Sequence, residues 1–140
     1  MKEKIRLEIL GLTYNQLHAG AYTLILGEVD GERKIPIIIG QTEAQAIAIQ
    51  LQQVETPRPL THDLTFQIMK KFQIDLREVF IYKVVKNVYF SELLCWKEGE
   101  KTEKIDARTS DAIALAVRYN CPIYIDKDIL DSMVFNKEGK

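Results

Sequence analysis

The sequence is short of the features that mark membrane, secreted and zinc-binding proteins. Its 140 residues contain no apolar run of about eighteen residues, the length that a membrane span needs. The amino terminus also lacks the apolar core of a signal peptide. The two cysteines, Cys95 and Cys121, lie far apart in apolar surroundings and outside any metal-type spacing. We therefore expect a cytoplasmic protein with reduced, packed thiols and no association with membranes.

An excess of positive charge is missing as well. The chain has 19 Lys and Arg against 20 Asp and Glu, which gives a net charge of −1. A protein that holds duplex DNA by electrostatics alone should be basic, so nucleic-acid binding here needs a local site or a bound cation. We see no groove of basic and aromatic residues in the sequence. The hydrophobic content of 46% is enough for the core of one domain, expected over residues 1–135, with a frayed tail at 136–140.

The first half of the chain predicts three strands followed by two helices. Asp30-Gly31 is typical of a type I′ hairpin between the second and third strands. Thr42 and Gln45 resemble a capping box, and Thr61 is a candidate cap for the second helix. The expected strands are 5–12, 22–29 and 34–39, and the expected helices are 42–54 and 62–72.

The second half repeats this plan. The segment from Asp30 to Arg33 matches that from Glu98 to Lys101, and Ala46–Ile49 matches Ala112–Leu115. We interpret the chain as a duplicated βββαα unit with halves at about 4–73 and 74–133, of α+β class. It should form a mixed or antiparallel sheet with buried apolar helices. The expected elements are strands 76–85, 88–96 and one ending near 106, a helix at 111–119, a strand at 123–125, and a last helix from Asp126 or Asp128.

Polar side chains gather where each half passes from its third strand to its first helix. The second junction carries two carboxylates, a guanidinium and two hydroxyls directly before the apolar run 112–116. A helix amino terminus offers free N–H groups and partial positive charge, which suit anions and phosphates. The first junction, 40–43, should be its equivalent in space. Apolar residues on both faces of the strand 22–29 also predict a covered sheet or a homo-oligomer, a dimer or larger.

At these residues the chain resembles the bifunctional nuclease domain family. The resemblance covers nearly the whole chain, in order. One departure is Thr109, where the family usually has proline. The resemblance implies DNase and RNase activity, with single-stranded or loosely structured nucleic acid as partner. The matching segments are 20–26, 36–40 with 43–47, 58–64, 105–108 with 110–115, and 122–124.

Hydrolysis of a phosphodiester needs an activated water, stabilisation of charge on phosphorus and, in most enzymes, Mg²⁺ or Mn²⁺ held by carboxylates. Histidine side chains exchange protons near neutral pH, so His62 is a candidate general base or ligand. Arginine binds phosphate through two parallel hydrogen bonds. The candidate catalytic residues are His62, Asp63, Asp106 and Asp111; the candidate metal ligands are Glu43, Asp63, Asp106 and Asp111; the candidate phosphate-binding residues are Arg58, Arg108 and Ser110.

The same residues allow a structural interpretation. Thr109 and Ser110 could cap the helix, and Asp111 suits its first turn. Arg108 could pair with Asp106 or Glu43 as a structural ion pair. The alternative to a metal-assisted nuclease is then a non-catalytic, oligomeric binding or assembly module whose polar cluster is architecture or an anion pocket.

Overall fold

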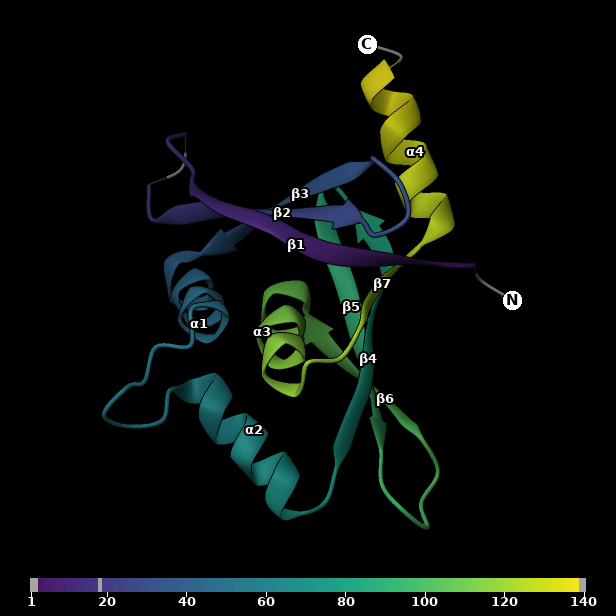
Figure 1. Ribbon diagram of the computed structural model, residues 1–140. Coiled ribbons are helices and arrows are strands. Elements are labelled where there is room, and N and C mark those ends of the chain that lie inside the picture. Colours follow the sequence, from purple (N-terminus) through teal and green to yellow (C-terminus); the bar gives the residue numbers. More distant parts are fainter. Residues whose placement is uncertain (1–2, 18, 139–140) are drawn as a thin grey trace.

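Seven strands in one sheet and four helices make up the computed structural model of the chain, within the residues that it describes, 3–17 and 19–138 (Figure 1). Within the sheet, β3, β2, β1 and β7 pair antiparallel in one group and β4, β5 and β6 in another, and the two groups join through the parallel pair of β7 and β4. The predicted α+β class with a mixed sheet is therefore confirmed. The strands are β1 (Lys4–Tyr14), β2 (Ala21–Glu28), β3 (Lys34–Gly40), β4 (Asp75–Val85), β5 (Val88–Trp96), β6 (Glu103–Arg108) and β7 (Ile123–Asp126). The helices are α1 (Gln41–Leu51), α2 (Thr61–Lys71), α3 (Thr109–Tyr119) and α4 (Lys127–Glu138).

The late strand β7 lies in the middle of the sheet, whose order is β3-β2-β1-β7-β4-β5-β6. It runs antiparallel to β1 and parallel to β4. Three consecutive strands from each half of the chain therefore flank it. The order is compatible with a duplicated unit, which stays a prediction.

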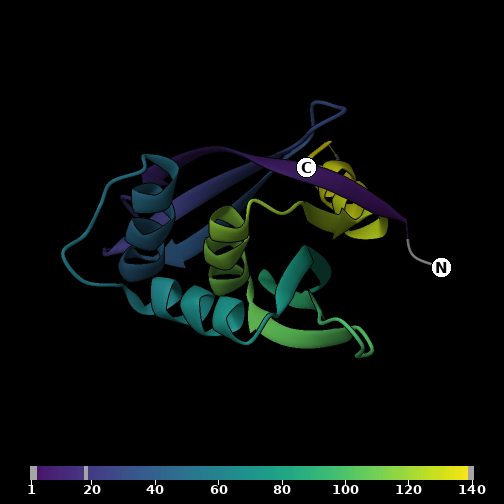
Figure 2. The ribbon, with the colours of Figure 1, turned by 60° about the horizontal axis from the view of Figure 1, so that its bottom comes forward.

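The sheet arches around α3, and Figure 2 shows β1, β2 and β3 on one side of this helix and β4, β5 and β6 on the other. The apolar run Ala112–Ala116 is no more than 5% exposed. Strands β4, β5 and β6 contact α3 from the sheet, and α1 and α2 contact it from the other side. A helix that is apolar nearly all round needs such an enclosure, because any open side would leave apolar surface in water.

The helix caps differ from those expected. The first helix begins at Gln41 after Gly40, without a side-chain cap, and it ends at Leu51, so the capping box at Thr42 is wrong. The cap position of α2 is Leu60 rather than Thr61, and that of α3 is Arg108, so Thr109 and Ser110 lie inside α3. In each case the residue before the helix is extended, which continues the strand or linker directly into the first turn.

The predicted type I′ turn at Asp30-Gly31 is also wrong. Strand β2 ends at Glu28 and β3 begins at Lys34, so a longer connection joins them. The two-residue turn with positive φ at both positions lies between β4 and β5, at Lys86 (φ 51°) and Asn87 (φ 67°). Asparagine tolerates this left-handed conformation better than most residues, which favours the turn there.

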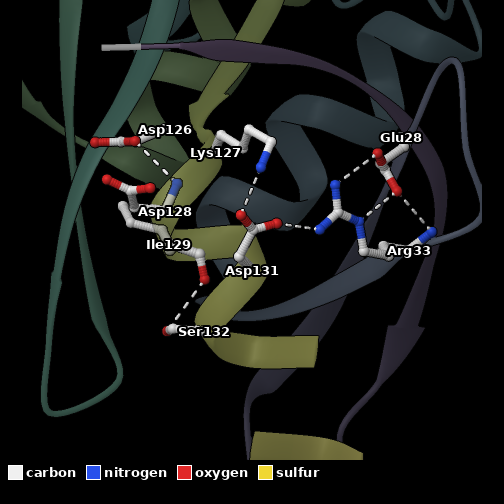
Figure 3. Close-up of polar contacts among 8 residues, drawn as sticks. All are labelled: Glu28, Arg33, Asp126, Lys127, Asp128, Ile129, Asp131 and Ser132. Carbon is white, nitrogen blue, oxygen red and sulfur yellow. Dashed lines mark hydrogen bonds and ion pairs between the residues drawn. The ribbon is translucent and has the colours of Figure 1, made fainter. Parts of the chain in front are cut away.

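The last helix is tied to the β2–β3 connection by charges. The Arg33 guanidinium donates to both Glu28 and Asp131, and Lys127 donates to Asp131 from one turn earlier (Figure 3). Leu130, next to Asp131 in α4, is fully buried. Helix α4 extends through Glu138, so it includes residues 136–138 of the expected frayed tail; residues 139–140 lie outside the described part of the chain. None of the helices in that part combines the length and the apolar character that crossing a membrane requires.

Replacing Ile113 by alanine should lower the free energy of unfolding by about 2–5 kcal/mol, because the substitution opens a cavity at a fully buried position of α3. Urea denaturation followed by circular dichroism measures the change. The control is Leu51→Ala in α1, where the residue is 50% exposed and the loss should stay below about 1 kcal/mol. Equal losses in the two variants would contradict the assignment of α3 to the core.

Candidate functional site

A hydrogen-bonded chain of four side chains joins the amino-terminal turns of α1, α2 and α3. Nε2 of His62 lies 2.9 Å from Oδ1 of Asp111, and Nε of Arg108 donates to Oδ2 of the same carboxylate at 2.9 Å. The Arg108 guanidinium also donates to Oε2 of Glu43 at 3.4 Å. Asp111 is therefore the centre of the cluster, and the two strand-to-helix junctions do meet. We call Glu43, His62, Arg108 and Asp111 the junction cluster.

Side-chain exposure in the junction cluster increases from His62 through Asp111 to Arg108. The His62 side chain is 10% exposed and that of Asp111 is 33% exposed, whereas the Arg108 side chain is 67% exposed. Partial burial by itself would raise the pKa of Asp111, but hydrogen bonds from His62 and Arg108 outweigh it and hold that pKa below its usual range. The cluster thus presents an ionised carboxylate behind an accessible guanidinium.

The backbone beside the junction cluster is fixed by Thr109. Its hydroxyl lies 2.6 Å from Oγ of Ser91 and donates to the carbonyl of Tyr89 at 3.1 Å, and both partners belong to β5. Thr109 is the first residue of α3, the position where proline is tolerated best in a helix. The threonine therefore occupies a proline-compatible position and adds a bond between α3 and the sheet.

A second polar cluster, Asp63 with Arg118, lies between the same three helices but apart from the first. Nε of Arg118 donates to Asp63 at 2.7 Å, and its other nitrogens donate to the carbonyls of Ala114 and Ala46 at 2.9 and 3.3 Å. The Arg118 side chain is only 2% exposed. Burial alone would raise the pKa of Asp63, but the Leu60 N–H and Arg118 lower it further than burial raises it. These contacts bind α2 to α1 and α3, and the adjacent residues His62 and Asp63 serve different clusters.

The remaining candidates occupy two other positions. Asp106 lies on β6 and accepts a hydrogen bond from the Tyr82 hydroxyl at 3.1 Å. Arg58 lines a pocket with Asp63 and Arg118, beside the linker between α1 and α2. Ser110 lines a groove with Asp106 and Arg108. The structure therefore divides the predicted site among three neighbourhoods.

The groove that holds Ser110 runs between the two edge strands of the sheet. One wall is the end of β3 with Gly40, and the other is the end of β6 with the first turn of α3. The turn at Asn87 and the start of β5 close its floor, and the groove has a volume of about 340 Å³. Arg108 belongs both to this groove and to the junction cluster, so the groove leads to the junction cluster.

The expected metal ligands do not form one site in this arrangement. Among residues 3–17 and 19–138, no three His, Cys, Asp or Glu side chains come close enough together to hold an ion. The four predicted carboxylates each have another partner: Glu43 and Asp111 share Arg108, Asp63 pairs with Arg118, and Asp106 accepts from Tyr82. The residues present therefore do not fit a shared four-carboxylate ion.

Two residues of the polar clusters were not singled out from the sequence, Arg118 and Tyr82. Arg118 follows Asp111 by two helical turns and comes directly after the apolar run 112–117, and a lone arginine beside such a run needs a buried partner. The sequence alone therefore offered a signal for a buried partner of Arg118. The contact of Tyr82 with Asp106 depends on the pairing of β4, β5 and β6, so no local pattern could have shown it.

Comparison with protein families decides the relationship that the motifs indicated. The model of the bifunctional nuclease domain matches residues 24–138. The chain belongs to the bifunctional nuclease domain family. The match includes the whole junction cluster, the Asp63–Arg118 pair and the groove between the edge strands.

Proteins from bacteria and plants resemble this chain. An uncharacterized protein of Mycobacterium tuberculosis is 40% identical over 107 residues, which are 76% of this chain and 63% of that protein. Bifunctional nuclease 2 of Oryza sativa subsp. japonica and bifunctional nuclease 1 of Arabidopsis thaliana are each 30% identical, over 109 and 110 residues. In both, the match covers 76% of this chain and 34% of the plant protein. The chain thus spans about a third of the plant relatives.

The stabilising effect of the Asp111 carboxylate should depend on pH. Because its pKa is lower in the folded protein than in the unfolded chain, the ionised form stabilises the fold above the unfolded value of about 4. This contribution is lost as pH falls through the lower, folded value. Denaturation of the parent and of Asp111→Asn from neutral to acidic pH should show a stability difference that shrinks in acid. A difference that stays constant into strong acid would contradict the pairing.

Proposed function

We propose that this domain cleaves phosphodiester bonds of RNA and DNA at the junction cluster. The observation that carries the proposal is the hydrogen bond between His62 and Asp111 beside an exposed arginine. A carboxylate that accepts from one imidazole nitrogen fixes the tautomer and leaves the other nitrogen free to accept a proton. Membership of a family whose plant members are named bifunctional nucleases supports the same reaction.

The proposed role of His62 is general base. With Nε2 donating to Asp111, Nδ1 can take the proton of an attacking water or, in RNA, of a 2′-hydroxyl. The carboxylate stabilises the imidazolium that this transfer creates, in the way that buried carboxylates orient catalytic histidines elsewhere. Asp111 is therefore a positioning residue for His62.

The proposed role of Arg108 is to bind the scissile phosphate. Its guanidinium is exposed and bonds Asp111 more closely than Glu43, at 2.9 Å against 3.4 Å. A phosphate could replace the longer bond while Asp111 keeps the shorter one. The amino-terminal turns of α1 and α3 add free N–H groups and partial positive charge on the same side.

The requirement for Mg²⁺ or Mn²⁺ stays a prediction, as does a cytoplasmic location. Asp106 and Arg58 lie outside the junction cluster, so we assign neither to the reacting bond. Single-stranded or loosely structured nucleic acid is the proposed substrate, since the chain lacks the positive charge that duplex binding requires.

Replacing His62 by glutamine should slow cleavage about 10²–10⁴-fold, because the substitution keeps hydrogen-bonding capacity but removes the base. The assay follows end-labelled single-stranded RNA and DNA in Mg²⁺, Mn²⁺ or EDTA. The control is Lys101→Gln, a change of an exposed turn residue remote from the junction cluster. Thermal unfolding of each variant shows whether it is folded.

Three outcomes separate the possibilities. The proposed site is supported if the His62→Gln variant no longer cleaves while the Lys101→Gln variant still does. The reaction in EDTA shows whether cleavage needs a metal ion. Cleavage that His62→Gln retains in full would overturn the role of His62. Absence of cleavage by the parent under every condition would favour the alternative, a non-catalytic assembly module.

One observation favours that alternative as a second candidate. Helix α2 and the residue that follows it carry an exposed apolar stripe: Leu64, Ile68 and Phe72 are 53%, 51% and 63% exposed. They recur every four residues, so they share one side of the helix, and Lys71 lies among them. Such a continuous apolar patch is typical of an interface, and we propose a second copy of the chain as its occupant.

The variant Ile68→Glu should shift the protein from dimer to monomer in light scattering coupled to size-exclusion chromatography. The charge would have to be buried without a partner in the contact between copies. Val29→Glu is the matched control, since Val29 is exposed to a similar degree in the β2–β3 connection. A parent that is monomeric at all concentrations would exclude this interface.

A further inference from the structure

The pairing of β4, β5 and β6 aligns aromatic and basic side chains that are far apart in the sequence. Phe90 on β5 lies opposite Lys83 on one side and Arg108 on the other. The register between β4 and β5 shifts between Ile81 and Lys83, so one extra residue, Tyr82, is accommodated there. A bulge of this kind redirects side chains, and here it brings Tyr82 and Lys83 to the same aromatic ring.

Contacts show that Tyr82, Lys83 and Phe90 share one face, and Arg108 lines the same groove as Phe90. The rings of Tyr82 and Phe90 have centroids 6.5 Å apart, and Nζ of Lys83 lies 5.0 Å from the Phe90 centroid. The alternate residues of β5, Ser91, Leu93 and Cys95, are buried toward α3. Phe90 therefore points to the outer face, where it is partly exposed, with the exposed side chains of Lys83 and Arg108 beside it.

We propose that this row, Tyr82, Lys83, Phe90 and Arg108, binds unpaired nucleotides of the strand that the junction cluster cleaves. The inference rests on the proposed function and deepens it. Bases would stack on the rings of Phe90 and Tyr82, and the two basic side chains would contact the flanking phosphates. A base that stacks on Phe90 would displace the Lys83 ammonium from the ring. The flexible side chain of Lys83 would then let the ammonium contact the neighbouring phosphate.

The groove between the edge strands connects this row to the junction cluster. Its lining includes Phe90 and Asn87 together with Arg108 and Gly40. Arg108 is common to the row, the groove and the junction cluster. A strand whose base stacks on Phe90 can therefore bring its next phosphate to the guanidinium beside His62.

The charges of this face favour a single strand over a duplex. Asp106 and Glu92 lie opposite each other on β6 and β5 and alternate with the basic residues. Asp106 accepts from the Tyr82 hydroxyl and so holds that ring in place. A duplex, with its dense phosphates and hidden base faces, would meet repulsion without gaining stacking, whereas an unpaired base gains the stacking energy.

The test measures binding separately from cleavage. Fluorescence anisotropy follows labelled oligothymidine and oligouridine of about 12 nucleotides, a length within the range of single-strand sites. Measurements use EDTA and the His62→Gln background, so that the probe stays intact. Phe90→Ala should weaken binding at least about fivefold. The separate variant Phe90→Tyr should bind as tightly as the parent, because only the ring is needed for stacking.

Two further variants test whether the ring of Phe90 and the charge of Lys83 are what the strand binds. Phe90→Leu keeps an apolar side chain of similar bulk, so its loss of binding would report the missing ring rather than altered packing. Lys83→Gln should lower the slope of log K against log salt by about 0.7, the value for one phosphate contact on a single strand. Lys101→Gln, the same change in the β5–β6 turn, should leave the slope unchanged.

The outcomes distinguish this proposal from the proposed function. Full binding by both Phe90→Ala and Phe90→Leu would overturn the stacking row even if His62→Gln abolishes cleavage. Tighter binding of a duplex of equal length would also overturn it. Strand binding that depends on Phe90, without cleavage by the parent, would support the row and reject the nuclease.

Discussion

The enclosure of α3 is the constraint on which the rest of the structure depends. Its run Ala112–Ala116 leaves no side that can face water, so the sheet must arch around it and two helices must close the remaining side. This enclosure brings the amino-terminal turns of α1, α2 and α3 together. The one charged side chain buried in α3, Arg118, is compensated by Asp63 and two carbonyls from α1 and α3, which lock the same three helices. The position of the junction cluster thus follows from core packing.

Arg118 within α3 and Arg108 at its cap position differ in exposure, and this difference separates a structural role from a proposed chemical one. The Arg118 side chain is 2% exposed and donates to Asp63 of α2, to a carbonyl of α1 and to a carbonyl of its own helix, so it stabilises the contact between helices. Arg108 is 67% exposed and bonds two carboxylates with room on its outer side. An arginine held in place but open to solvent is suited to bind an anion, and this contrast is the reason for assigning the scissile phosphate to Arg108 rather than to Arg118.

Arg108 also links the two proposals. It ends β6, precedes α3, forms part of the groove and stands opposite Phe90 on β5. A stacking surface on the sheet and a reacting pair at the helix termini would otherwise be separate features. Since both proposals share this side chain, the proposed stacking surface and the phosphodiester bond whose cleavage His62 would assist as general base lie along one path.

The sequence by itself determined the class of the fold, the approximate strands and the family, because alternation, apolar runs and the motifs at 36–47, 58–64 and 105–115 are local signals. It also pointed to the two junctions, and Glu43 and Asp111 do meet there through Arg108. Tertiary structure alone decided which candidates work together. His62 and Asp63 are adjacent in the chain, yet neighbours on a helix point about 100° apart, so they join different clusters. Likewise, only strand pairing aligns Lys83, Phe90 and Arg108 into the aromatic and basic surface that the sequence did not reveal.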